Sequence, residues 1–421
     1  MRIAVIGSGI SGLSAAWMLS KSHQVTLYEA QPRLGGHTNT VDVHVDGYQF
    51  PVDTGFLVFN ERTYPNLIAL FATLGVASTE SQMTFSVQAG QGAIEWCGTD
   101  LSTVFAQKRN LLRPKFLRML LQILRCNREM TAEHMAGTLG DERLGDWLDR
   151  NGYGQAMRDW YLVPMTAAIW STPPSEALDY PVATFARFCH NHGLLTVNDR
   201  PRWRTVLGGA REYVKILAAG ITHVRAGTPI SSVRRSPEGV VITPVGGHEE
   251  HFDQVVLACH SDQQLRMLSD ASPMERSVLE RVRYQPNVAV LHTDASFLPK
   301  ARKAWAAWNY HVGPAGTDQA SVTYLLNDLQ PLPTQTPVMV TLNPLRDPDP
   351  ATVRARFDYE HPLFDPAAIA AQRDLATIQG GNRVWFAGAW TRYGFHEDGL
   401  MSGLAVAKGL GSVAPWERAV A

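Results

Sequence analysis

The sequence of 421 residues predicts an α/β fold, in which a nucleotide-binding domain is interrupted by a second domain of mixed sheet and helices. Three observations predict it: a strand, glycine loop, helix and strand at the N-terminus, strand-like runs after residue 222, and a glycine-spaced helix near the C-terminus. Alternating strands and helices are typical of a parallel sheet covered on both faces. The chain is 45% apolar and long enough for two domains.

The first elements form a βαβ unit. Residues 2–6 are a β-branched run, which predicts a buried strand, while SGLSAAWMLSKS predicts a helix and QVTLYEA a second strand. Gly7, Gly9 and Gly12 form a G-x-G-x-x-G motif between strand and helix, and Glu29 ends the second strand. This context predicts a Rossmann-like unit, whose helix N-terminus receives a pyrophosphate and whose acidic residue receives ribose hydroxyls.

The remaining elements follow from local patterns. Residues 100–200 read as helices, and strand-like runs follow at 222–258 (THVRAGTPISSVRR, GVVITPV, DQVVLAC) and at 284–345 (AVLHTD, AAWNYHV, SVTYLL, PVMVTL). RVWFAGAW predicts a last strand and DGLMSGLAVAKGL a last helix. The predicted nucleotide domain therefore covers residues 1–80, 200–262 and 380–421. The predicted substrate domain covers residues 81–199 and 263–379.

Four motifs in order carry a resemblance to a known family: the N-terminal glycine motif, RLGGHT, DTGF, and GAW followed by HEDGL. They resemble motifs of the FAD-dependent amine oxidase and phytoene desaturase superfamily. The resemblance implies FAD as cofactor, bound non-covalently because none of the four cysteines lies in the C-terminal motif. It implies cofactor contacts from Gly7, Gly9, Ser11, Gly12, Glu29, Gly35, Gly36, His37, Thr38, Thr54, Gly55, Phe56, Ile230, Gly388, Trp390, Asp398, Gly399 and Leu400.

Within that superfamily the chain is most similar to bacterial predicted NAD/FAD-binding proteins, on RWRTVLGGAREYV, AAWNYH, SVTYLLN and YGFHEDGLMSGLAVA. Members of that group tend to accompany cyclopropane-fatty-acid-synthase-like methyltransferases, which implies acyl-chain chemistry. By motif position Tyr393 and His396 lie beside the flavin and are the candidate catalytic residues, although the acidic pair after His396 equally fits a helix cap. Four aromatic residues of the predicted strands either line an apolar tunnel or belong to the core: Trp305, Trp308, Tyr310 and Tyr324.

The expected function is an FAD-dependent oxidoreductase that removes a hydride from an apolar substrate. Desaturation of a plain or methylated fatty acyl chain of a membrane phospholipid is the first hypothesis. Oxidation of a small amine is the second, and a flavin- or lipid-binding partner protein without turnover is the third. The sequence has no second glycine motif and hence no expected nicotinamide domain. The electron acceptor therefore stays open between oxygen, a quinone and another protein.

A basic amphipathic stretch runs from residue 108 to residue 128, with seven basic and no acidic residues. On a helix, Lys115, Arg118, Gln122 and Arg125 would share one narrow arc, and apolar residues would fill the rest. The pattern predicts a helix in the interface of an anionic membrane. The alternative is an ordinary helix that packs on the substrate domain and exposes a solvated basic face.

Composition sets the remaining expectations. A formal net charge of −1 gives no indication of a nucleic-acid partner. The four cysteines have no metal or disulfide spacing, so we expect no metal site and a reducing compartment. Neither a signal peptide nor an uninterrupted apolar run of about 18 residues is recognisable. We therefore expect a cytoplasmic protein, peripheral on the inner face of the cytoplasmic membrane.

Overall fold

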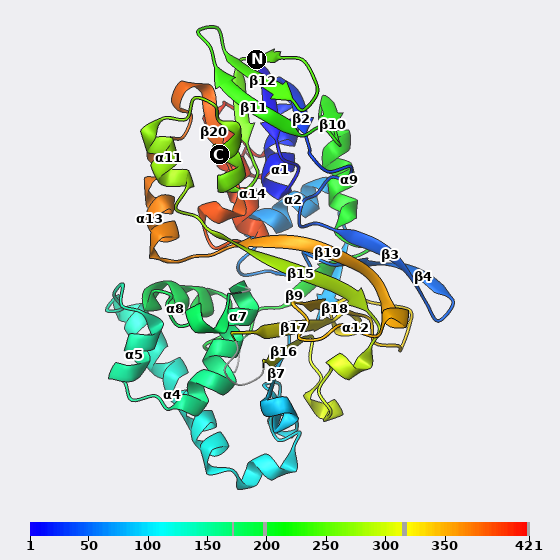
Figure 1. Ribbon diagram of the computed structural model, residues 1–421, viewed down its shortest axis with the longest axis vertical. Coiled ribbons are helices and arrows are strands. Elements are labelled where there is room, and N and C mark those ends of the chain that lie inside the picture. The colour runs from blue at the N-terminus through cyan, green and yellow to red at the C-terminus, as the bar shows by residue number, and fades with distance from the viewer. Residues whose placement is uncertain (171, 197–199, 314–317, 419–421) are drawn as a thin grey trace.

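The computed structural model describes residues 1–170, 172–196, 200–313 and 318–418 (Figure 1). Its first domain contains a five-stranded parallel sheet, which confirms the predicted α/β fold. The strands, in order across the sheet, are β10 (His223–Arg225), β2 (Gln24–Tyr28), β1 (Arg2–Ile6), β14 (Gln254–Leu257) and β20 (Val384–Phe386). Because β1 is central, the loop that follows it opens at the middle of the sheet's carboxyl edge.

One face of this sheet is covered by four helices, α1 (Ile10–Leu19), α2 (Pro65–Leu74), α9 (Arg211–Ala219) and α14 (His396–Gly409). Their buried side chains share one hydrophobic cluster with Ile3, Val5 and Val25 of the strands. Helices α1 and α14 lie so close together that a Cβ atom on Gly403 would come within 2.3 Å of the Ser11 carbonyl oxygen. The C-terminal helix therefore packs directly on the first helix of the chain, although they lie almost 400 residues apart.

The other face is covered by an antiparallel sheet and three helices. They are β11 (Ile230–Arg235), β12 (Val240–Pro244), β13 (Glu250–Phe252), α10 (Ser261–Met267), α11 (Pro273–Leu279) and α13 (Pro366–Asp374). The predicted limits place α11 and α13 in the substrate domain. In the structure their buried residues Val278 and Ala368 pack in one cluster with Val255 and Val384 of the parallel sheet. Burial of small apolar side chains thus attaches both helices to the nucleotide-binding half.

The second domain is built on a mixed seven-stranded sheet. Its order is β19 (Val353–Pro362), β15 (Tyr284–His292), β18 (Met339–Leu342), β17 (Ala320–Leu325), β16 (Trp308–Val312), β7 (Phe85–Ala89) and β8 (Ile94–Cys97). Only β16 and β7 pair in parallel among these strands of the described chain. The long strands β15 and β19 run between the two halves of the molecule, with the helical layer below them in Figure 1.

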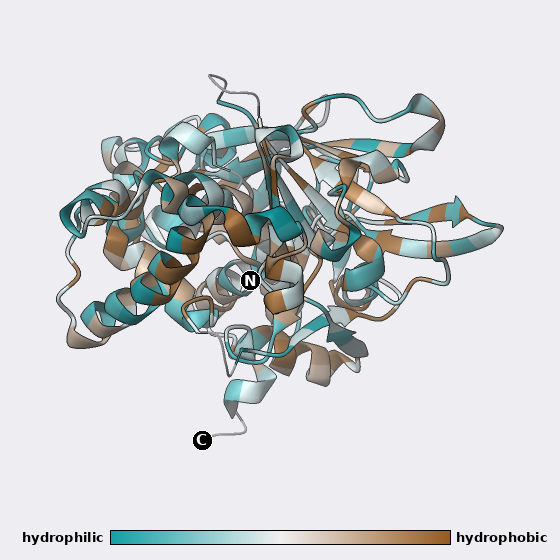
Figure 2. Ribbon diagram, turned by 90° about the horizontal axis from the view of Figure 1, so that it is seen from below, coloured by the Kyte–Doolittle hydropathy of each residue, from teal (hydrophilic) through white to brown (hydrophobic). Residues whose placement is uncertain are grey.

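Smaller elements complete the chain. The helical layer comprises α3 (Leu101–Val104), α4 (Pro114–Ala136), α5 (Leu144–Arg150), α6 (Gln155–Met157), α7 (Val163–Trp170) and α8 (Val182–Asn191). The others are β3 (Thr40–Val45), β4 (Tyr48–Asp53), β5 (Phe59–Asn60), β6 (Ser78–Ser81), β9 (Trp203–Val206), α12 (Leu326–Leu329) and α15 (Pro415–Arg418). In Figure 2 the helices change between brown and teal along their length, as expected for helices with one buried and one solvated face.

The predicted helix over 108–128 differs in the structure. A 3₁₀ turn covers Lys108–Leu112, and α4 starts at Pro114, in the first-turn position expected for proline. The predicted cationic arc is wrong in part, because Gln122 accepts from the backbone N–H of Gly154 and Arg125 pairs with Glu129 at 2.7 Å. Both therefore face the protein. No helix in the described part of the chain is long and apolar enough to span a bilayer.

Candidate active site

A cavity of about 1720 Å³ joins the two domains. Gly7, Gly9 and Glu29 line it at the carboxyl edge of the parallel sheet, and Leu120 and Ile123 of α4 line it in the helical layer. Drug-sized ligands occupy pockets of roughly 300–1,000 Å³. The space is therefore sufficient for a dinucleotide together with a second molecule, and its two ends differ in chemistry.

The glycine turn after β1 forms the floor of the nucleotide end. Gly7 has φ +105°, and a Cβ atom on Gly12 would lie 1.9 Å from the Gly7 carbonyl oxygen, so both positions require glycine for the turn itself. A Cβ atom on Gly9 would meet no protein atom within 4 Å. Gly9 therefore faces open cavity at the N-terminus of α1, where the backbone favours an anionic group.

Glu29 lies where the sequence predicts it, on the cavity wall after β2. Its carboxylate accepts from the backbone N–H of Ser8 at 2.9 Å, the Ser8 hydroxyl at 2.6 Å and the N–H of Gln31 at 2.9 Å. Ile230 of β11 lines the same region. Ser8 escaped the sequence analysis because it occupies an unspecified position of the motif, although it fixes the acidic residue in place.

The segment RLGGHT closes the loop from the other side. The N–H of Gly35 donates to the Ser8 hydroxyl at 3.1 Å, and Gly36 packs against Gly9. His37 stands where the resembled family usually has arginine. Its ring stacks on Tyr359 at 5.1 Å, and burial holds its pKa well below the ordinary range. Its Nε2 is buried and has no hydrogen-bond partner in the described chain. This unpaired nitrogen and the open space at Gly9 both fit a bound dinucleotide.

Phe56 and His396 form a stacked pair on the wall, with ring centroids 3.7 Å apart. Nε2 of His396 lies 2.6 Å from the Tyr213 hydroxyl and 3.3 Å from the Thr38 hydroxyl. Burial lowers the pKa of His396 to about 3, so its ring is neutral near pH 7. A neutral, fixed imidazole suits cofactor positioning, and it is a weak proton acceptor. Thr54 and Gly55 line the wall beside Phe56.

Some residues of the C-terminal motif line the cavity, and others lie behind the lining residues and support them. Trp390 lines the cavity, and its buried Nε1 has no partner in the described chain. Asp398 accepts from the N–H of Phe395 at 3.0 Å, which makes it a cap of α14, and burial raises its pKa to about 6. Several predicted contact residues lie behind the wall and support it: Gly12, Thr38, Gly388, Asp398, Gly399 and Leu400. Ser11 lies on the wall itself.

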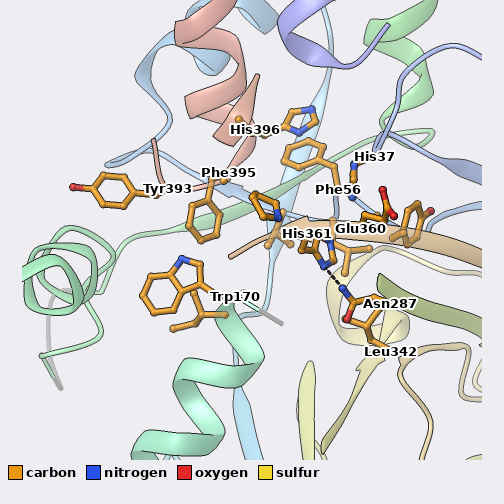
Figure 3. Close-up of a pocket in the computed structure, with 18 of the residues that line it drawn as sticks. His37, Phe56, Trp170, Asn287, Leu342, Glu360, His361, Tyr393, Phe395 and His396 are labelled. Carbon is orange, nitrogen blue, oxygen red and sulfur yellow. Dashed lines mark hydrogen bonds between the residues drawn. The ribbon is translucent and has the colours of Figure 1, made fainter. Parts of the chain in front are cut away.

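Beyond the glycine turn, apolar side chains form most of the wall, and Figure 3 shows Trp170, Leu342 and Phe395 among them. Tyr393 lines this region, and Arg187 donates to its hydroxyl at 3.4 Å. Trp308 and Tyr324, opposite each other on β16 and β17, also line it. Tyr310 is buried in the core instead, and Trp305 packs elsewhere on Leu325 and Met339. The wall also includes aromatic residues that the sequence analysis missed: Phe85, Trp170, Phe188, Phe357, Phe364 and Phe395.

Some polar groups of this region are paired, whereas the ring N–H groups of Trp96, Trp170 and Trp308 and Oδ1 of Asn127 are buried on the wall without a hydrogen-bond partner in the described chain. The side-chain N–H of Asn287 contacts Nδ1 of His361 at 3.0 Å, and His260 lies 3.2 Å from Glu360. Burial lowers the pKa of His361 to about 4, so that it is neutral. Within the described residues, no group of three or more His, Cys, Asp or Glu is placed to hold a metal ion. Because most of the wall is apolar, the region is suited to an uncharged, mainly apolar molecule.

Comparisons with known proteins agree with this geometry. The family model of flavin containing amine oxidoreductases matches residues 10–410. A carotenoid phi-ring synthase of Chlorobaculum tepidum is 41% identical over 78 residues, which are 18% of this chain and only 12% of that protein. Cyclohexylamine oxidase from Brevibacterium oxydans IH-35A has a TM-score of 0.70 at 18% identity, over 97% of this chain and 99% of that one.

A third similar protein is a CLA-producing fatty acid isomerase from P. acnes, with a TM-score of 0.64 at 14% identity over 97% of this chain and 98% of that one. At such identities the two structural matches establish the fold. The match of the family model over almost the whole length, together with a cradle that fits a dinucleotide, establishes the family and its cofactor. The chain belongs to the family of flavin containing amine oxidoreductases and is an FAD-dependent oxidoreductase.

Proposed function

We propose that this protein desaturates the acyl chain of a lipid with FAD. One observation carries the proposal: the cofactor cradle opens, without a break, into a cavity walled by aliphatic and aromatic side chains as far as α4. Such a wall binds a hydrocarbon chain by excluding it from water, at roughly 0.8 kcal/mol per CH₂ group. The volume of the cavity and its apolar wall thus favour a large apolar substrate.

The charged groups near the cavity support the same choice. A small amine is a cation near pH 7, and it would gain from a free carboxylate. Of the four carboxylates on the cavity wall, Glu29 is engaged by Ser8, Glu360 lies against His260, and Asp100 accepts the N–H groups that open α3. The fourth, Asp358, is exposed to solvent and has no ion pair or side-chain hydrogen bond with another described residue. An acyl chain needs none of these groups. It would be held along its length by the apolar wall.

When bound, FAD accepts a hydride from one carbon while the neighbouring carbon releases a proton, which leaves a new double bond. The residues of the chain position the acyl group and exclude water, which is the main requirement of such a transfer. Tyr393, at the edge of the cavity, is the group through which the proton would reach solvent. The neutral His396, stacked on Phe56, would hold the cofactor.

Two similar proteins support apolar chemistry by name, since one is a fatty acid isomerase and the other a carotenoid phi-ring synthase. A second candidate function is amine oxidation. It is favoured by the likeness to cyclohexylamine oxidase and by the aromatic side chains of Trp170, Tyr393 and Phe395 at one place in the cavity. Those rings can flank an uncharged amine as well as an alkyl chain.

An anaerobic panel tests the proposal. The holoprotein is mixed without oxygen with phospholipids that carry plain, unsaturated or methyl-branched chains, and separately with aliphatic amines, while the flavin absorbance is recorded. The proposal expects bleaching by at least one class of lipid and none by the amines. Bleaching by amines alone would replace it by amine oxidation. A lack of bleaching by every compound would favour a flavin-binding protein without turnover.

A further inference from the structure

Helix α4 lies at the end of the molecule opposite the parallel sheet (Figure 1). Leucine side chains are exposed on α3, on the 3₁₀ turn and on α4. We call Leu101, Leu112, Leu117, Leu121 and Leu124 the leucine rim; their exposed fractions are 77%, 88%, 38%, 68% and 56%. We propose that the leucine rim docks on an anionic lipid bilayer, so that acyl chains pass from the bilayer into the cavity. This inference rests on the proposed function.

Helix α4 has two apolar faces with different environments. Phe116, Met119 and Met130 are fully buried in the core of the helical layer. Leu117, Leu121 and Leu124, spaced by four and three residues, form a separate exposed stripe. The core-facing residues explain why α4 folds as a helix. They do not explain the stripe, and contiguous exposed apolar side chains of this kind mark interaction sites.

The leucine rim is continuous with the wall of the cavity. Leu101 and Val104 of α3 and Leu120, Ile123 and Leu124 of α4 line the cavity. Leu101 and Leu124 are therefore both cavity wall and exposed surface. A hydrocarbon chain that entered the cavity past these two leucines would therefore stay in apolar surroundings along its path.

The charges around the leucine rim select the partner. Lys108, Lys115, Arg118 and Arg128 are exposed, and none of the four has an ion pair or side-chain hydrogen bond with another described residue. Each basic residue near an anionic membrane strengthens binding by about fivefold, and the contributions of several residues multiply. The same cations would repel the same face of a second copy, because a symmetric dimer would bring identical charges together. An anionic bilayer would bury the leucine side chains among its acyl chains and place its anionic headgroups near the basic residues.

The other basic residues of this stretch stabilise the fold and leave the rim charges free. Arg109 and Arg113 donate to the carbonyl oxygens of Gly92 and Ala93, and Arg125 pairs with Glu129 and lies over Tyr153. The docking charges are therefore a defined subset of the seven basic residues. Variants can address that subset without touching the residues that hold the turn and the helix.

Vesicle co-sedimentation of the holoprotein tests the inference. We expect binding to vesicles of phosphatidylglycerol and phosphatidylcholine, weak binding to pure phosphatidylcholine, and release at about 1 M salt, where the Debye length is about 3 Å. The variant L112D/L121D should lose at least about tenfold in partition, because it removes apolar contact with the bilayer, and K115E/R118E/R128E a similar amount, because it reverses three charges that face anionic headgroups. All proteins are matched for FAD content and melting temperature before comparison.

Matched controls place the same changes elsewhere. Val245, 62% exposed, and the exposed Arg276 lie on the nucleotide-binding half. V245D and R276E should sediment like the wild type. Equal loss in rim and control variants, or equal binding to neutral and anionic vesicles, would overturn the inference.

A soluble short-chain acyl ester separates the two proposals. If it bleaches the wild-type flavin while anionic vesicles fail to bind the protein, docking is wrong and the proposed function stands. If vesicles bind through the rim while neither the ester nor any lipid bleaches the flavin, docking stands and the proposed function is wrong.

Discussion

At the nucleotide end of the cavity the wall is backbone, whereas at the far end it is side chain. The glycine turn, with Gly9 facing open space, is fixed by contacts such as that between Gly12 and the Gly7 carbonyl. The far end is assembled from Trp170, Trp308 and Leu342, which come from three separate elements. The first construction binds one cofactor and tolerates little change. The second can be reshaped by single substitutions, which makes it the place where specificity is set.

The largest expected effect separates two roles of glycine in the same turn. G9V should lose FAD but fold and melt like the wild type stripped of FAD, because its side chain enters empty cavity that the pyrophosphate would occupy. G12V should lose both FAD and folded protein, since a Cβ atom there overlaps the Gly7 carbonyl. Circular dichroism and flavin absorbance of both variants check this. A G9V protein that keeps its yellow colour would break the distinction.

The next largest effect is expected from a substitution at the apolar end of the cavity, which should weaken substrate binding and leave FAD binding unchanged. Ala168 of α7 is buried and lines the cavity, so the ring of A168F would take the place of several methylene groups of substrate. We expect a loss of about 2 kcal/mol in acyl binding, roughly thirtyfold in kcat/KM. FAD content should be unchanged. Loss of FAD with unchanged lipid kinetics would show that the two ends are not separate.

The pH dependence of stability has a source outside the cavity. His292 is fully buried, accepts the N–H of Asp294 at Nδ1 and has a pKa lowered to about 4, mainly by burial. Because its folded pKa is depressed, its stabilising contribution is present above pH 6.5 and is lost as the pH falls toward 4, by up to about 3 kcal/mol. Thermal unfolding of wild type and H292Q between pH 7 and 4.5 measures this. A variant with the same slope as the wild type would contradict the assignment.

The smallest effect is expected at Tyr393. If positioning dominates the reaction, Y393F should slow flavin reduction by less than about tenfold, whereas loss of a true general base typically costs about 10²–10⁴-fold. Rapid-mixing kinetics as a function of pH checks this. A loss of a thousandfold, together with a missing limb in the pH profile, would make Tyr393 a catalytic base.

The sequence predicts the nucleotide end well, because its signals are local. Gly7, Gly9 and Glu29 lie within one βαβ unit, so their spacing alone fixes their places on one sheet edge. Local spacing predicts the roles of the residues in the C-terminal motif less completely. Asp398 matches by position but caps its own helix, since its carboxylate accepts the N–H of Phe395, three residues before it.

The residues of the apolar end of the cavity could not be predicted from motif spacing, because an aromatic residue that lines a cavity and one that lies in the core look alike in sequence. Trp308 and Tyr310 are two residues apart on β16 with different neighbours, and only Trp308 reaches the cavity. The prediction of one cationic arc on the basic stretch 108–128 was wrong in part for a related reason. Helical periodicity places Arg118 and Arg125 on one arc, but only contact with α4's own Glu129 and the loop at Asn151 decides that Arg125 faces the protein.

The most direct test of the account is the product of a single turnover. The holoprotein is mixed anaerobically with a phospholipid of defined acyl chains, in less than equimolar amount relative to flavin, and the lipid is analysed by mass spectrometry. The account predicts an acyl chain lighter by two daltons, with one flavin reduced for each double bond formed. Reduced flavin with an unchanged acyl mass, or an unchanged flavin in the presence of every lipid, would contradict it.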